Sequence, residues 1–242
     1  LSGSKPANSP IEQNHRLTLV ESSTLVDPER YRRIVGRLIY LTITCLHLSY
    51  AVHTLSQFMQ QPKQAHLESA LRVLKYIKRN PGQGLLLKSD CDLKLHAYYD
   101  SDWASCPLTR RSVTGFFAMI GISPILWRTK KQVKVSCSSA EAEYRAMAAA
   151  TTELVWLKGF LASLGVLHNS PMELFCDNQA ALHITANLVF HERTKHIELD
   201  CHFVCDHILS NNIVTVHIRS KFQLADLFIK ALGQTDFLAF LS

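Results

Sequence analysis

The chain has 242 residues, of which 47% are hydrophobic and 19% charged, a balance that is typical of a folded globular protein and excludes a disordered or fibrous one. Lysine and arginine outnumber aspartate and glutamate by 26 to 20, which favours a polyanionic partner. The seven cysteines are odd in number, scattered and without a C-x-x-C pair, which argues against a disulfide framework or a zinc ribbon. We therefore expect an intracellular protein, cut from a longer polypeptide, with no membrane span and no signal peptide.

The first third of the sequence predicts a leader followed by helices. Residues 1–26 are rich in Ser, Pro, Asn and Gln, which is typical of a flexible linker. Asp27 then supplies an N-cap, Pro28 occupies the first helical position, and apolar residues recur at helical spacing from Tyr31 onward. Two further helical stretches lead to the turn at 80–84. We predict a small helical unit over residues 27–84.

A second domain of α/β class is predicted over residues 85–242. Apolar residues alternate before Asp100 as they do in a strand, and two more strand-like runs precede a long helix. The full pattern is βββαβαβα with one extra helix, and its segments lie at 93–100, 113–120, 125–135, 139–164, 172–176, 178–186, 198–209, 213–218 and 223–233.

Two aspartates each follow a predicted strand. Asp100 ends the alternating segment 93–100, and Asp177 follows the short strand 172–176 just before a helix. If these strands are adjacent and parallel, the two carboxylates lie side by side at one edge of the sheet. Metal-assisted hydrolysis of a phosphodiester needs several carboxylates in one pocket, so both residues are candidate metal ligands.

The later helices add two more acids. Glu143 is predicted to face the sheet because it heads a helical stripe made by Met147, Ala150, Leu154, Leu157 and Leu161. An acid in that place costs free energy unless it is paired or binds a metal. Glu141 instead has the spacing of a capping box with Ser138 and of an outward ion pair with Arg145. Asp226 opens the last helix, where the helix dipole alone also favours an acid.

Six motifs carry a resemblance to the ribonuclease H region of copia-type retrotransposon Pol polyproteins, preceded by the tail of the reverse transcriptase. They are YYDSDWA at 98–104, TRRS at 109–112, SSAEAEYRA at 138–146, CDNQA at 176–180, HERTKHIE at 191–198 and QLADLF at 223–228. The segment YRRIVGRLIYL at 31–41 resembles the part that follows the polymerase core in these elements. The polymerase's own Tyr-x-Asp-Asp type motif is absent, so we expect no DNA synthesis.

The resemblance implies an RNase H-like fold, a five-stranded mixed sheet flanked by helices, preceded by a helical thumb or connection unit. It implies cleavage of the RNA strand of an RNA–DNA hybrid by two Mg²⁺ ions, with Mn²⁺ as a substitute and no small-molecule cofactor. One ion is expected on Asp100, Glu143 and Asp177, and the other on Asp100 and Asp226. Phosphate contacts are expected from basic and polar side chains on two segments, namely Arg110, Arg111, Arg193, Thr194, Lys195 and His196.

The same resemblance implies two partners, the RNA–DNA hybrid and the upstream reverse transcriptase domain of the parent polyprotein. It implies that the protein is located in the cytoplasmic virus-like particle of the element. The sequence leaves open a catalytically silent remnant, because Cys45-Leu46-His47 stands where the family usually has Arg-Pro-Asp. An integrase or transposase of the same fold is disfavoured by the fourth acid. A zinc site at Cys201 and Cys205 lacks a second ligand pair, and His217 falls within a strand, which argues against a catalytic role for it.

Overall fold

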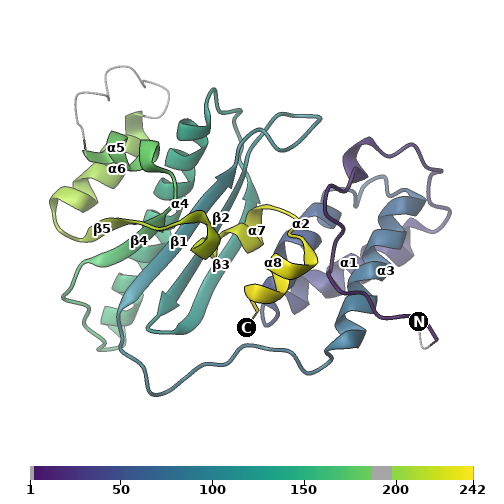
Figure 1. The fold of residues 1–242 in the computed structure, drawn as a ribbon, viewed down its shortest axis with the longest axis horizontal. Coiled ribbons are helices and arrows are strands. Elements are labelled where there is room, and N and C mark those ends of the chain that lie inside the picture. Colours follow the sequence, from purple (N-terminus) through teal and green to yellow (C-terminus); the bar gives the residue numbers. More distant parts are fainter. Residues whose placement is uncertain (1–2, 187–197, 242) are drawn as a thin grey trace. The chain divides into compact units, whose positions relative to one another are not determined.

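The computed structural model describes the backbone of residues 3–186 and 198–241. The chain separates into two compact units, of which the first is Leu1–Leu85 with Lys230–Ser242 and the second is Leu86–Ile229 (Figure 1). The boundary near residue 85 agrees with the division expected from the sequence. The C-terminal end does not, because residues 230–242 belong to the first unit and not to the α/β domain predicted over 85–242.

The first unit is helical, with α1 (Pro28–Leu41), α2 (Ser49–Ser56), α3 (Gln64–Arg79) and α8 (Gln234–Ala239). The helix α1 begins where the sequence predicts, since the Arg30 amide donates to Asp27 Oδ1 at 3.0 Å. Its apolar face buries Tyr31, Val35 and Leu38 in the core of this unit.

The flexible leader predicted over residues 1–26 is wrong for the part that the structure describes. Ile11 and Leu17 are buried, and the Leu17 carbonyl lies 2.9 Å from Nε2 of His66 on α3. Thr24 forms an isolated antiparallel bridge with Lys63. The polar composition of the segment concealed these contacts, because its backbone groups and a few apolar side chains suffice to hold it on α3.

The C-terminal segment joins the helical unit through aromatic packing. Phe237 meets His47 and Tyr76 edge-on, with ring centroids 6.4 Å and 5.6 Å apart. Burial lowers the pKa of His47 to about 4, so the ring is neutral at physiological pH. His47, which departs from the family pattern, is therefore accommodated as a core side chain.

The second unit is built on a five-stranded mixed sheet of order β3-β2-β1-β4-β5. The strands are β1 (Leu95–Asp102), β2 (Val113–Ile120), β3 (Ser123–Lys131), β4 (Met172–Cys176) and β5 (Ile213–His217). The first three pair antiparallel, whereas β4 pairs parallel with both β1 and β5. The α/β class and the RNase H-like sheet expected from the sequence are confirmed.

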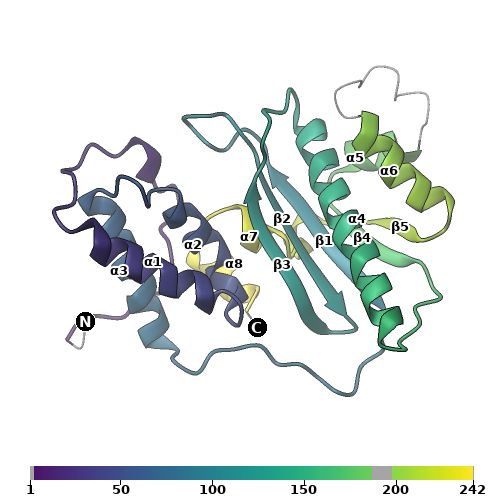
Figure 2. The same ribbon diagram turned by 180° about the vertical axis from the view of Figure 1, so that it is seen from behind.

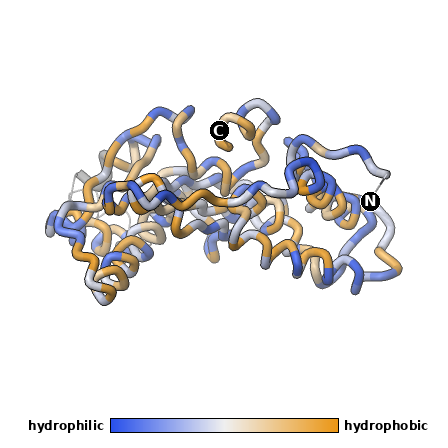
Figure 3. Tube along the Cα trace, turned by 90° about the horizontal axis from the view of Figure 1, so that it is seen from below, coloured by the Kyte–Doolittle hydropathy of each residue, from blue (hydrophilic) through white to orange (hydrophobic). Residues whose placement is uncertain are grey.

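Helices cover both faces of this sheet (Figure 2). The long α4 (Ser139–Ser163) lies on one face with α5 (Gln179–Ala186) and α6 (Glu198–Leu209), and the short α7 (Asp226–Ile229) lies on the other. Tyr99, Met147, Leu154, Leu174 and Val204 meet in the core between the sheet and α4. Figure 3 shows hydrophilic residues interspersed along the helices, and no helix among the described residues is long and apolar enough to cross a membrane.

The last predicted helix, 223–233, is shorter than expected. A single 3-10 turn (Ser220–Phe222) precedes α7; between them Gln223 has an extended backbone and residues 224–225 form a turn. The reason is Gln223, whose side chain is fully buried and accepts a hydrogen bond from the Ala225 amide at 3.2 Å. This local bond replaces a helical one and holds the backbone out of the helix.

Candidate active site

The sheet brings Asp100 and Asp177 to the same edge. The parallel register of β1 and β4 ends with Tyr98 opposite Phe175, and Asp100 and Asp177 each lie two residues beyond that last pair. The strand β1 continues to Asp102, so Asp100 lies inside it and is buried, whereas Asp177 follows β4 and is half-buried. Burial is the main cause that raises the pKa of Asp100, and Asp177 is close enough for its charge to add to that effect.

Glu143 reaches the same place from α4. Its side chain is 5% exposed, and both the hydroxyl and the amide of Ser101 donate to its Oε1, at 3.1 Å and 3.3 Å. Its Oε2 is buried and accepts no hydrogen bond from the described residues. A buried carboxylate oxygen without a donor is costly unless a cation satisfies it. The predicted stripe behind Glu143 is present, with Met147 and Leu154 fully buried.

Glu141 starts the same helix and has a structural role. Its amide donates to Ser138 Oγ at 3.2 Å, its carboxylate accepts from the Cys137 amide at 2.6 Å, and Arg145 pairs with it at 2.8 Å. The N-cap at Ser138 and the ion pair predicted from the spacing are both confirmed, and the Glu141 carboxylate binds the amide of Cys137, one residue before the N-cap. The expected outward orientation is wrong, because Glu141 is buried beside the helix terminus that it caps.

Asp226 is carried to the cluster by the segment before α7. Gln223 Nε2 donates to the carbonyl of Tyr99, the neighbour of Asp100, at 3.0 Å. This bond fixes the start of α7 beside β1, where the buried Asp226 lies within hydrogen-bonding reach of Asp100. The sequence pattern placed Gln223 in a motif without indicating that its amide positions an acid.

A glycine allows α7 to approach the sheet. Gly115 on β2 is the register partner of Asp100, and a Cβ at Gly115 would lie 2.6 Å from Ile229 Cγ2 and 2.9 Å from Phe228 Cβ. Only a residue without a side chain leaves room for the helix. Gly115 is not among the site residues predicted from the sequence, although a glycine inside an apolar strand signals a close approach of backbone.

Asp100 and Glu143 interact strongly, and Asp177 and Asp226 lie close enough to act on Asp100. Burial, followed by the charge of Glu143, raises the pKa of Asp100 to about 10. Burial raises the pKa of Glu143 to about 7, against the hydrogen bonds from Asp100 and Ser101 that lower it. Such a cluster supplies the oxygen donors that hard divalent cations prefer. Among the described residues, however, no group of three or more His, Cys, Asp or Glu side chains lies so that it could hold a metal ion without rearrangement.

The expected phosphate-binding residues fall in two segments. Arg110 and Arg111 are exposed on the turn that joins β1 to β2, at the end of β1 nearer to Asp100. The turn is closed by the Arg110 amide, which donates to the Cys106 carbonyl at 2.8 Å, and Arg110 has a positive φ of 53°. The second segment, Arg193, Thr194, Lys195 and His196, lies outside the described residues.

Two further candidates have surroundings that the structure describes. His217 is the last residue of β5 and is exposed. It pairs with Cys176, the residue directly before Asp177. Cys201 and Cys205 are buried on α6, and the Tyr144 hydroxyl lies 3.9 Å from Cys205 Sγ. These two thiols pack against α4.

Sheet order, helix placement and the acid cluster together define the second unit as an RNase H-like domain. The chain is 41% identical over 238 residues to the retrovirus-related Pol polyprotein from transposon RE1 of Arabidopsis thaliana, covering 98% of this chain and 16% of that protein. It is 42% identical over 233 residues to the corresponding RE2 polyprotein, with 96% and 16% covered. The chain therefore belongs to the family of retrovirus-related Pol polyproteins from transposons, and it spans about a sixth of the length of these relatives.

Comparison with solved structures finds the N-terminal RNase H domain of a Mycobacterium tuberculosis protein. The match has 11% sequence identity and a TM-score of 0.41, and it covers 62% of this chain and 96% of that domain. No protein-family model matches the chain.

Proposed function

We propose that this chain hydrolyses the RNA strand of RNA–DNA hybrids, using two divalent metal ions, as a step in the reverse transcription of its parent element. The observation that carries the proposal is the convergence of Asp100, Glu143, Asp177 and Asp226, which come from β1, α4, the residue after β4 and α7. A purely structural acid would be expected with a basic partner, whereas these acids gather around one another.

In the proposed arrangement Asp100, Glu143 and Asp177 hold one Mg²⁺ ion, and Asp100 and Asp226 hold the other, with Mn²⁺ as a substitute. When bound, the two ions supply an activated water and stabilise the departing 3′ oxygen. Ser101 acts as a positioning residue, because its two donors orient Glu143 and leave Oε2 for a cation. Gln223 and Gly115 set the place of Asp226.

Binding of the hybrid in this proposal depends on its phosphates and its shape. Arg110 and Arg111 are exposed on the turn that follows β1, the strand that carries Asp100, and guanidinium groups there would steer a polyanion without reading its bases. Arg193, Thr194, Lys195 and His196 are proposed to extend the same surface. The upstream reverse transcriptase domain is the proposed protein partner, and the cytoplasmic virus-like particle of the element is the proposed location.

The test is cleavage of a hybrid whose RNA strand is labelled, with RNA duplex and DNA duplex controls, first with Mg²⁺ and then with EDTA. Mg²⁺-dependent cutting of the RNA strand of the hybrid alone supports the proposal. A folded chain that binds the hybrid and cuts nothing favours the alternative function, a catalytically silent remnant that binds nucleic acid.

A further inference from the structure

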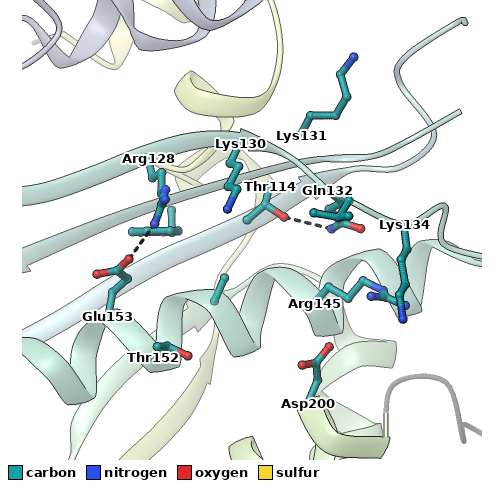
Figure 4. A pocket seen from close by; sticks show the side chains of 13 residues that line it. Thr114, Arg128, Lys130, Lys131, Gln132, Lys134, Arg145, Thr152, Glu153 and Asp200 are labelled. Carbon is teal, nitrogen blue, oxygen red and sulfur yellow. Dashed lines mark hydrogen bonds and ion pairs between the residues drawn. The ribbon is translucent and has the colours of Figure 1, made fainter. Parts of the chain in front are cut away.

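A basic pocket of about 390 Å³ lies between the edge strand β3 and α4, apart from the carboxylate cluster (Figure 4). Arg128 and Lys130 point from β3 toward α4, and Lys134 lies on the loop that follows. Arg145 lines it from α4, two residues after Glu143 and thus on a different side of that helix. The pocket is a separate surface of the same domain.

The floor of the pocket is held by a buried amide. Gln132 Nε2 donates to Thr114 Oγ1 and to the Ala142 carbonyl, both at 3.0 Å, and its Oε1 accepts from Ser136 Oγ at 3.0 Å. These bonds join β2, the start of α4 and the intervening loop. The basic side chains therefore project from a rigid base, which reduces the entropy lost when they bind a ligand.

The cations of the pocket are only partly neutralised. Arg128 pairs with Glu153 at 2.9 Å, and Arg145 is occupied by Glu141. Lys130 and Lys134 have no ion-pair or hydrogen-bond partner within 3–182 and 199–241, where side chains are described. Asp200 lies near Lys134 and Arg145, which lower its pKa against the larger effect of burial that raises it. Positive charge is in excess, and it suits a phosphate group.

An aromatic pair continues the pocket along α4. Trp156 follows Glu153 by three residues and Thr152 by four, so it lies on the pocket-lining face of the helix, one turn further on. Trp156 and Phe160 stack with centroids 5.4 Å apart and rings 7° from parallel. They are 55% and 47% exposed, which leaves ring surface open to a ligand.

We propose that this face of α4 and β3 binds a single-stranded segment of nucleic acid, with phosphates at Lys130 and Lys134 and a base stacked on Trp156. Excess positive charge beside exposed aromatic rings is the combination that binds unpaired strands, whose bases are free to stack. A duplex would use the lysines but not the rings. The inference goes beyond cleavage and does not depend on the carboxylates.

The experiment measures binding of labelled oligonucleotides of about ten nucleotides, oligo(dT) and oligo(rU), to the full chain by fluorescence anisotropy in EDTA. Each phosphate contact on a single strand contributes about 0.7 to the slope of log affinity against log salt. We therefore expect Lys130→Ala/Lys134→Ala, which removes two such contacts, to reduce the magnitude of the slope by about 1.4. Trp156→Ala should weaken binding about fivefold or more, and Trp156→Phe should restore most of the affinity. Lys88→Ala/Lys94→Ala, an equal charge change at exposed lysines of the same unit, is the matched control.

Equal binding by wild type and Trp156→Ala overturns the proposal, as does a control pair that lowers the salt slope as much as the pocket pair. A third contrary outcome is self-association, seen by sedimentation, that Trp156→Ala abolishes while oligonucleotide affinity stays unchanged. The urea midpoint of each variant shows that loss of binding is not loss of folding. Failure of hybrid cleavage by the wild type would refute the proposed function and leave this result intact.

Discussion

The close approach of α7 to β2 makes Gly115 the most informative position to change. In Gly115→Ala the new Cβ would lie 2.6 Å from Ile229 Cγ2, and ordinary contact begins at 3.4 Å, so α7 has to move by about 0.8 Å. Overpacking of this kind costs about 1–3 kcal/mol of stability. Because Asp226 begins α7, the same movement displaces one of the four acids, and a displacement near 1 Å lowers catalytic rates about 100-fold.

The assay combines urea unfolding with hybrid cleavage. All three tryptophans, Trp103, Trp127 and Trp156, belong to the second unit, so tryptophan fluorescence reports its unfolding separately from the helical unit. The control is Gly159→Ala on α4, where a Cβ meets nothing within 4 Å and should stabilise the helix by about 0.5–1 kcal/mol. A Gly115→Ala chain as stable and as active as the wild type would show that α7 does not lie against β2 as described.

Three more predictions concern the same cluster. Asp177→Asn should abolish cleavage and leave hybrid binding intact or stronger, since it removes a proposed ligand and a negative charge; full activity would refute the site. Burial and Glu143 raise the folded pKa of Asp100 above its ordinary value, so the stability that this group contributes is present at low pH and falls as pH rises from about 4 to about 10. Asp100→Asn should flatten that fall in urea titrations with EDTA, and an unchanged pH dependence would contradict the burial of Asp100 among acids. Gln223→Ala should cost about 1–3 kcal/mol, because it leaves the Tyr99 carbonyl and the Ala225 amide without their partner, and a null effect on the urea midpoint would contradict this contact.

Local patterns in the sequence were sufficient to predict the strands, the buried face of the long helix and the helix caps. Alternation of apolar residues placed the strands of the sheet, and the spacing behind Glu143 gave the buried face of α4. Caps were equally readable, since Asp27 and Ser138 act on the next turn of their own helices. Where periodicity gave no guide, as over residues 3–26, a segment expected to be flexible is held on α3 by single contacts.

By itself, therefore, the sequence determined the α/β class, the order of strands and helices, and the four candidate acids. Each of these depends on a pattern of residues close to one another along the chain. Only the tertiary structure decided that Gly115 leaves room for α7, that Gln223 anchors Asp226 beside Tyr99, and that residues 230–242 belong to the helical unit. These features join residues distant in sequence. Their energies come from packing and from hydrogen bonds that form only when the sheet is assembled, and no local pattern records them.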